Sequence, residues 1–206
     1  MSDIAAIMQL APVIPVLTVE RVADARPLAE ALVAGGLRAL EITLRTPAAL
    51  DVIRAMKDVE GAVVGAGTIL TSKHLDAAFQ AGARFIVSPG LTEDIAEEAG
   101  VAGVPLLPGV ATATEVMRGL DLGLTHFKFF PAEQAGGASM LKAFAGPFAT
   151  ARFCPTGGVS PGNAATYLGL PNVLCVGGSW IATPDLIAAG AWAEIRARAR
   201  AAAELR

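Results

Sequence analysis

Eight short apolar runs recur along the chain about every 20 to 26 residues, and no other feature of the sequence constrains the fold as strongly. Each run is rich in residues that favour strands, and each interval has room for one loop and one helix. The runs are residues 13–17, 39–43, 62–66, 85–88, 105–108, 126–130, 152–155 and 173–176. This repeat predicts eight successive strand–helix units.

Helix signals occupy the segments between these runs. Threonine or serine precedes several of the segments and glycine follows several of them, as is typical of helix caps. The expected helices are residues 22–34, 46–57, 73–81, 93–99, 113–120, one that opens at Ser160-Pro161, and a final helix within residues 191–206. Strands that alternate with helices are usually parallel and buried on both faces, which explains why the runs are apolar throughout.

Eight such units in 206 residues predict an α/β fold, a single compact (β/α)8 TIM barrel that spans residues 1–206 as one domain. A doubly wound open sheet is the alternative. That fold usually carries a glycine-rich phosphate fingerprint after its first strand, and residues 17–20 contain no glycine. We see no linker or low-complexity tract that would mark a domain boundary.

Composition and charge exclude several classes of protein. Apolar residues make up 53% of the chain and charged residues 17%, which argues against disorder. The net charge of -3 gives no basic surface for nucleic acid. Residues 1–19 lack Lys and Arg, so no secretory signal is expected, and no run resembles a membrane span. The two cysteines, Cys154 and Cys175, fit core positions in a reducing, cytoplasmic compartment.

Two of the predicted strands carry a charge in mid-run. Because side chains alternate along a strand, Glu41 lies on the opposite face from Leu40 and Ile42, and Lys128 on the opposite face from Phe127 and Phe129. The apolar faces should contact the helices. Both charged side chains should therefore point into the barrel.

Two interpretations of this buried pair remain open. One is a structural ion pair, although burying two charges costs several kcal/mol each unless they are well paired. The other is a nucleophilic lysine, whose pKa burial among phenylalanines should lower. An uncharged Lys128 amine could then attack a ketone and form a Schiff base, with Glu41 as the group that moves protons.

Further polar residues cluster where the predicted strands end, at the face that carries catalysis in barrels. Arg45 could hold a substrate carboxylate through two hydrogen bonds, and Thr68 follows glycines that allow a ligand to approach. Pro89 lies at the end of the fourth run. A surface arginine, a turn threonine and a plain turn are the alternatives at these three positions.

Glycine pairs end the last two runs, Gly157-Gly158 and Gly177-Gly178. Barrels often bind phosphate after strands 7 and 8 through bare backbone N–H groups, although ordinary turns would also use glycine. Metal chemistry is not expected, because His74 and His126 are isolated and neither cysteine has zinc-site spacing.

The segment 127–133, Phe-Lys-Phe-Phe-Pro-Ala-Glu, resembles the Schiff-base segment of the 2-dehydro-3-deoxy-phosphogluconate (KDPG) and 4-hydroxy-2-oxoglutarate (KHG) aldolases. The likeness continues in the same order through residues 40–46, 64–68, 88–90, 152–158 and 174–180. One departure is Thr18, at a position where some relatives carry a cationic residue.

The resemblance implies a class I aldolase, a carbon–carbon lyase that needs no cofactor and no metal and is commonly a homotrimer. It implies cleavage of 2-dehydro-3-deoxy-6-phosphogluconate to pyruvate and D-glyceraldehyde 3-phosphate, with 4-hydroxy-2-oxoglutarate and the galactonate epimer as competing substrates. By this resemblance, Lys128 would form the imine and Glu41 would be the general acid/base. Arg45 and Thr68 would bind the carboxylate, and Pro89 and Phe130 would line the pyruvate site. Thr156 would contact the aldehyde, and the phosphate would be bound by Gly157, Gly158, Gly178 and Ser179.

Two rivals from other classes also remain. A phospho-ligand-binding barrel without activity would bind sugar phosphate but form no imine. A metal-dependent pyruvate aldolase would lose activity on chelation, although the chain offers few metal ligands.

Overall fold

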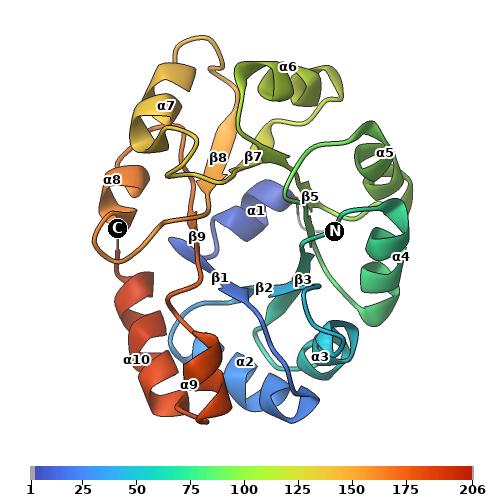
Figure 1. Ribbon diagram of the computed structural model, residues 1–206, viewed down its shortest axis with the longest axis vertical. Helices are drawn as coiled ribbons and strands as arrows, with labels where there is room; N and C mark the ends of the chain where they lie inside the picture. The colour runs from blue at the N-terminus through green and yellow to red at the C-terminus, as the bar shows by residue number, and fades with distance from the viewer. Residues whose placement is uncertain (1–2, 206) are drawn as a thin grey trace.

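The computed structural model describes residues 3–205 and is a closed ring of parallel strands with helices around its outside (Figure 1). This is the predicted (β/α)8 barrel, and the open sheet is ruled out because the last strand pairs with the first. Val13, Ile14 and Pro15 of the first strand lie in register with Val176, Gly177 and Gly178 of the last.

Nine short strands fill eight positions of the ring. They are β1 (Val13–Leu17), β2 (Ala39–Thr43), β3 (Val63–Gly67), β4 (Ile86–Val87), β5 (Leu106–Leu107), β6 (Gly109–Val110), β7 (His126–Phe129), β8 (Arg152–Pro155) and β9 (Val176–Gly178). β5 pairs with β4, and β6, just beyond Pro108, pairs with β7, so these two strands share the fifth position. A bridge between Thr156 and Gly177 joins β8 to β9 and closes the ring.

The helices form the outer layer, except for α1. They are α1 (Ile4–Met8), the 3-10 turn η1 (Val22–Asp24), α2 (Ala25–Ala34), α3 (Ala49–Met56), α4 (Ser72–Ala81), α5 (Glu93–Ala102), α6 (Ala113–Asp121), α7 (Gly137–Phe144), α8 (Ala164–Leu168), α9 (Pro184–Ala188) and α10 (Trp192–Ala203). Over residues 3–205, none of them is long and apolar enough to cross a lipid bilayer.

Some predicted boundaries are wrong. The helix expected to end before Gly100 continues to Ala102 and ends at Gly103, which has a left-handed backbone (φ +64°). A glycine with helical dihedrals only weakens a helix, whereas the left-handed conformation ends it. The last strand was expected at residues 173–176, but only a bridge forms at Val173 and the strand begins at Val176. α1, α7 and α9 were not predicted.

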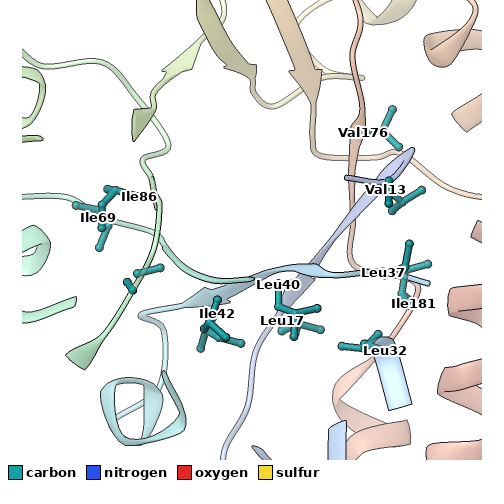
Figure 2. Packing of buried hydrophobic residues seen from close by; sticks show 14 of the residues in the cluster. Val13, Leu17, Leu32, Leu37, Leu40, Ile42, Ile69, Ile86, Val176 and Ile181 are labelled. Atoms are coloured by element: carbon teal, nitrogen blue, oxygen red, sulfur yellow. The ribbon is translucent and has the colours of Figure 1, made fainter. Parts of the chain in front are cut away.

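The strands bury opposite faces in different surroundings, as their alternation predicts. Leu40 and Ile42 point away from the hollow of the ring and pack in the large cluster between strands and helices (Figure 2). Phe127 and Phe129 belong to the same cluster. The intervening Glu41 therefore faces the interior of the ring.

α1 crosses the ring of strands in Figure 1 and closes one end of the barrel. Its buried Ile7 and Met8 pack with residues at the starts of the strands and inside the ring, among them Ala39, Phe85 and Cys154. This second, smaller cluster fills the amino-terminal end of the barrel with apolar side chains. Polar chemistry is thereby confined to the carboxyl-terminal end.

Candidate active site

A buried ion pair spans the interior of the barrel. Lys128 Nζ of β7 lies 3.2 Å from Glu41 Oε1 of β2, and the two residues are 4% and 3% exposed. Their strands are not neighbours in the ring, so the two side chains meet across it. The expectation that both charges share the interior is confirmed.

Small neighbours leave room for this pair. Glu41 lies in register with Gly65 on β3, and Lys128 lies in register with Gly109 on β6. Gly67, two residues beyond Gly65, faces the carboxylate, because a Cβ atom there would lie 2.8 Å from Glu41 Cδ. The glycines of β3 were expected to admit a ligand; at Gly67 the structure shows room made for Glu41 itself.

An aromatic ring covers the lysine. Lys128 Nζ lies 5.2 Å from the centroid of the Phe130 ring, within the range at which a cation and a ring attract. Phe130 directly follows β7 and is half-buried, and the bond from it to Pro131 is cis. The lysine thus has an acid partner on one side and an apolar wall on another.

Arg45 and Thr68 meet at the mouth of the barrel, after β2 and β3. Arg45 Nε donates to Thr68 Oγ1 at 3.2 Å, and the guanidinium is exposed. Thr68 has φ +60°, a left-handed conformation that is costly for a threonine and is often found at functional sites. The pair presents a cation and a hydroxyl just beyond the carboxyl ends of β2 and β3, and Arg45 lies four residues after Glu41.

Pro89 lies on a turn that two other residues fix in place. Ser88 is fully buried and its hydroxyl donates to the Gly90 carbonyl at 2.7 Å. Gly109 approaches the turn so closely that a Cβ there would lie 2.8 Å from Gly90 N. Sequence reasoning missed Ser88 and Gly109, and a serine within an apolar run was the available signal.

The ends of β8 and β9 carry the other predicted residues. Thr156 is 7% exposed and pairs with Gly177. Gly157 and Gly158 have φ of +99° and +78°, which glycine adopts freely. Within residues 3–205, their two N–H groups donate no backbone hydrogen bond. Gly178 ends β9 and the exposed Ser179 follows it, directly after Gly177, which is bridged to Thr156.

Of the two cysteines, Cys154 borders this site, because it lies in register with Lys128 and its Sγ is 3.9 Å from Thr156 Oγ1. Burial lowers the pKa of His126, with a raising effect of Asp3 and a further lowering by Arg152, and its Nδ1 lies 3.0 Å from Thr125 Oγ1. Cys154 and Cys175 are buried thiols, as expected. Across residues 3–205, no group of three or more His, Cys, Asp or Glu side chains is arranged to hold a metal ion.

Comparison with known proteins identifies similar chains. The family model described as "KDPG and KHG aldolase" matches residues 4–198. The 2-dehydro-3-deoxy-phosphogluconate aldolase of Zymomonas mobilis is 60% identical over 181 residues, which cover 88% of this chain and 87% of that one. The KHG/KDPG aldolase of Escherichia coli K12 is 51% identical over 96% of this chain and 93% of its own length.

A solved structure is similarly close. The KDPG aldolase of Legionella pneumophila, with pyruvate captured at low pH as a covalent carbinolamine intermediate, superposes with a TM-score of 0.96 at 44% identity. The superposition covers 98% of this chain and 99% of that one. A carbinolamine is the adduct that an amine forms with a ketone before water leaves.

Proposed function

The chain belongs to the KDPG and KHG aldolase family, and from that premise we propose how its own residues carry out the reaction. It is a class I aldolase, a carbon–carbon lyase that cleaves 2-dehydro-3-deoxy-6-phosphogluconate to pyruvate and D-glyceraldehyde 3-phosphate, the step known from the Entner–Doudoroff pathway. The observation that carries the proposal is the 3.2 Å contact between Lys128 and Glu41 inside the barrel.

Lys128 forms the covalent link with the substrate. Only an uncharged amine attacks a carbonyl, and Glu41 is close enough to take the ammonium proton. The nitrogen adds to the C2 ketone to give a carbinolamine. Glu41 then returns its proton to the leaving hydroxyl, so that water departs and a protonated imine forms. The apolar wall of Phe130 shields this imine from bulk water.

Glu41 then moves the protons of the cleavage step. It takes the proton of the C4 hydroxyl, directly or through a water, while the C3–C4 bond breaks. The electron pair of that bond passes into the imine to give an enamine, and the aldehyde leaves. Glu41 gives that proton to C3 of the enamine, and hydrolysis of the resulting imine releases pyruvate and restores the amine of Lys128.

The two ends of the substrate have separate binding groups. Arg45 and Thr68 bind the carboxylate next to C2, and Pro89 and Phe130 line the pyruvate part of the site. Thr156 contacts the aldehyde part. The backbone of Gly157, Gly158, Gly178 and Ser179 binds the phosphate, a role supported by the N–H groups at 157 and 158 that no carbonyl engages in residues 3–205. Thr18 adds no cation there, so these contacts carry the phosphate alone.

A second substrate is 4-hydroxy-2-oxoglutarate, which yields pyruvate and glyoxylate. The name of the Escherichia coli relative, at 51% identity, includes this activity. Its keto-acid half is the same as that of the phosphorylated substrate, so Lys128, Glu41 and Arg45 would act alike on both. Steady-state rates on these two compounds and on the galactonate epimer measure the preference.

Residues 1–206 act as one catalytic domain in a cytoplasmic homotrimer. Val101 and Met117 are 85% and 56% exposed on α5 and α6, and burial between subunits would remove such apolar surface from water. Buried thiols at Cys154 and Cys175 suit the reducing cytoplasm. Light scattering of the purified protein tests the assembly, and a monomer at micromolar concentration would contradict it.

Borohydride trapping tests the imine. Reduction in the presence of pyruvate should leave a stable adduct on Lys128, detected by peptide mass spectrometry. Lys128→Ala should give no adduct and no turnover, whereas Lys142→Ala, on the exposed face of α7, should keep both. Folded wild-type protein that gives no adduct would contradict the proposal.

The same preparation distinguishes the two rival functions. A binding protein would retain sugar phosphate but show neither turnover nor adduct. A metal-dependent aldolase would lose its rate in EDTA, whereas the rate of the imine enzyme should not change.

A further inference from the structure

Glu133 ends the segment that contains the lysine, and the proposed reaction gives it no role. It lies on the turn that follows β7, and its backbone N–H donates to the Gly157 carbonyl at 3.1 Å. The preceding Ala132 N–H donates to the Thr156 carbonyl at 2.8 Å. The turn after the lysine strand therefore runs directly beside the loop after β8.

Gly157 and Gly158, at the start of that loop, have no side chains that could fix their position. Gly157 and Gly158 both have left-handed backbones, so neither position favours a larger residue. The side chain of Glu133 packs against the loop, because a Cβ atom on Gly158 would lie 2.8 Å from Glu133 Cβ. One wall of the loop is thus the Glu133 side chain.

The other wall is the start of α8. Asn163 Nδ2 donates to the Gly158 carbonyl at 3.1 Å, while its Oδ1 accepts from Ser160 N at 2.8 Å. Tyr167 lies one turn further along α8, and its N–H donates to the Asn163 carbonyl at 3.4 Å. The loop 157–158 therefore lies between Glu133 and the first turn of α8.

A hydrogen bond from Tyr167 Oη to Glu133 Oε1 joins the two walls. Tyr167 is 1% exposed, and its ring is held in the core beneath α8. Burial, together with the hydrogen bond to Glu133 and its charge, raises the pKa of Tyr167, so its hydroxyl remains a donor throughout the physiological range. Gly137 lies next to this pair, since a Cβ atom added to it would be 3.4 Å from Tyr167 Oη.

We propose that Glu133 and Tyr167 are positioning residues that hold the loop 157–158 in the geometry that binds the substrate phosphate. This inference rests on the proposed function, because it takes the backbone of the loop as the phosphate site. Backbone N–H groups bind an anion well only when they converge on it, and this convergence depends on where the loop is held.

Binding of the keto-acid end of the substrate should not depend on the hydrogen bond between Glu133 and Tyr167, which we call the clamp. Arg45 and Thr68 follow β2 and β3, whereas Glu133 and Tyr167 contact the loop after β8. Loss of the Tyr167 hydroxyl should therefore weaken the binding of phosphorylated substrate and leave that of 4-hydroxy-2-oxoglutarate nearly unchanged. A residue that only stabilised the fold would affect both substrates equally.

Steady-state kinetics of four variants test this selectivity. Tyr167→Phe and Glu133→Ala each remove the hydrogen bond, and each should raise KM for the phosphorylated substrate about tenfold while kcat changes little. Glu133→Gln keeps an oxygen that accepts from Tyr167 and should retain the wild-type KM. Gln134→Ala, at the exposed neighbouring position, is the matched control. Calorimetric binding of inorganic phosphate to the same proteins gives a readout that needs no turnover.

The outcomes separate the two proposals. An unchanged KM ratio between the two substrates in Tyr167→Phe and Glu133→Ala, in variants that melt cooperatively, would overturn the positioning role while the aldolase function stands. A wild-type protein that cleaves neither substrate but binds phosphate about tenfold more tightly than Tyr167→Phe would overturn the function and leave the clamp supported.

Discussion

Among single residues, Glu41 depends on the small size of Gly67, which has no Cβ atom. A Cβ on Gly67 would lie 2.7 Å from Glu41 Cγ, closer than two carbon atoms can approach. Gly67 does not have a positive φ, so other residues could adopt its backbone conformation. An alanine there is therefore excluded by the position of Glu41 and not by backbone strain.

Gly67→Ala should lower kcat strongly, because the carboxylate is pushed away from Lys128. General acid–base catalysis contributes about 10²- to 10⁴-fold, so a loss of at least about 10²-fold is expected. Borohydride trapping of pyruvate should still modify Lys128, but more slowly than in wild type, because Glu41 no longer takes the ammonium proton. Gly100→Ala, where a Cβ would contact nothing within 4 Å, is the control. Full activity in Gly67→Ala would show that Glu41 needs no such space.

Arg45→Ala should raise KM for both keto-acid substrates with a smaller effect on kcat. Hydrogen bonds to a charged group contribute about 1.5–3 kcal/mol, which corresponds to roughly a 10- to 100-fold weaker interaction. Arg45→Lys should lie between wild type and alanine, because it keeps the charge but loses the two-point geometry. Equal KM values in wild type, Arg45→Ala and Arg45→Lys would show that Arg45 does not bind the carboxylate.

At the scale of elements, threonine caps explain which helix starts the sequence predicts well. Thr71, Thr92 and Thr112 each accept a hydrogen bond from the N–H three residues later, and the three helices begin within one residue of the expected position. Thr46 does not cap its helix, because its hydroxyl donates to the Val19 carbonyl, and α3 begins later, at Ala49. A threonine before a helix predicts where the helix starts only when its side chain has no hydrogen-bond partner elsewhere in the fold.

Thr112→Ala should destabilise the protein by about 1 kcal/mol, the usual effect of losing a helix cap. Thr112 accepts from Glu115 N at 3.3 Å, and Glu115 Oε2 accepts from Thr112 N at 2.9 Å, a reciprocal capping box. Denaturant unfolding of Thr112→Ala measures the effect, with Thr112→Ser as the variant that keeps the cap. Equal stability of the alanine and serine variants would refute the role.

The charge on Glu115 should make this cap depend on pH. Burial would raise the pKa of Glu115, but hydrogen bonds from Ala111, then Thr112, bring it below its ordinary value of 4.5. A carboxyl group with a depressed pKa stabilises the fold above its unfolded pKa and loses that effect as pH falls through the folded pKa. Glu115→Gln should thus be less stable than wild type at pH 7, and the difference in unfolding free energy should vanish on acidification below 4.5. A difference that does not change with pH would contradict this.

In the molecule as a whole, the outer layer of helices closes through the contact between α2 and α10. Gly35 follows α2, and a Cβ there would collide with Ala199 Cβ of α10 and lie 2.8 Å from the Arg196 carbonyl. α10 thereby packs close to α2 and completes the outer layer (Figure 1). The lack of a side chain at Gly35 thus allows α2 and α10 to pack closely.

Gly35→Ala should destabilise the barrel by about 1–3 kcal/mol, because an extra methyl group in a packed contact forces the helices apart. Gly100→Ala adds the same group inside α5 with nothing within 4 Å and should stabilise by about 0.5–1 kcal/mol. Thermal and denaturant unfolding of both variants checks the opposite signs. A neutral Gly35→Ala would mean that α10 shifts without a penalty.

Local sequence patterns are enough to predict the strand–helix periodicity of the barrel and the inward face of each strand. Regular intervals and period-2 alternation act locally, so Glu41 and Lys128 could be assigned to the interior without coordinates. The lysine segment also indicated the family, which the match over residues 4–198 confirms.

The contacts across the ring and around its rim could be found only in the folded structure. The 3.2 Å contact joins residues 87 positions apart, and the link between Glu133 and Tyr167 joins residues 34 apart. The close approaches at Gly35 and Gly67 likewise arise between separate elements. Such contacts depend on strand register and helix packing, which no local pattern encodes because they are fixed only when the ring closes.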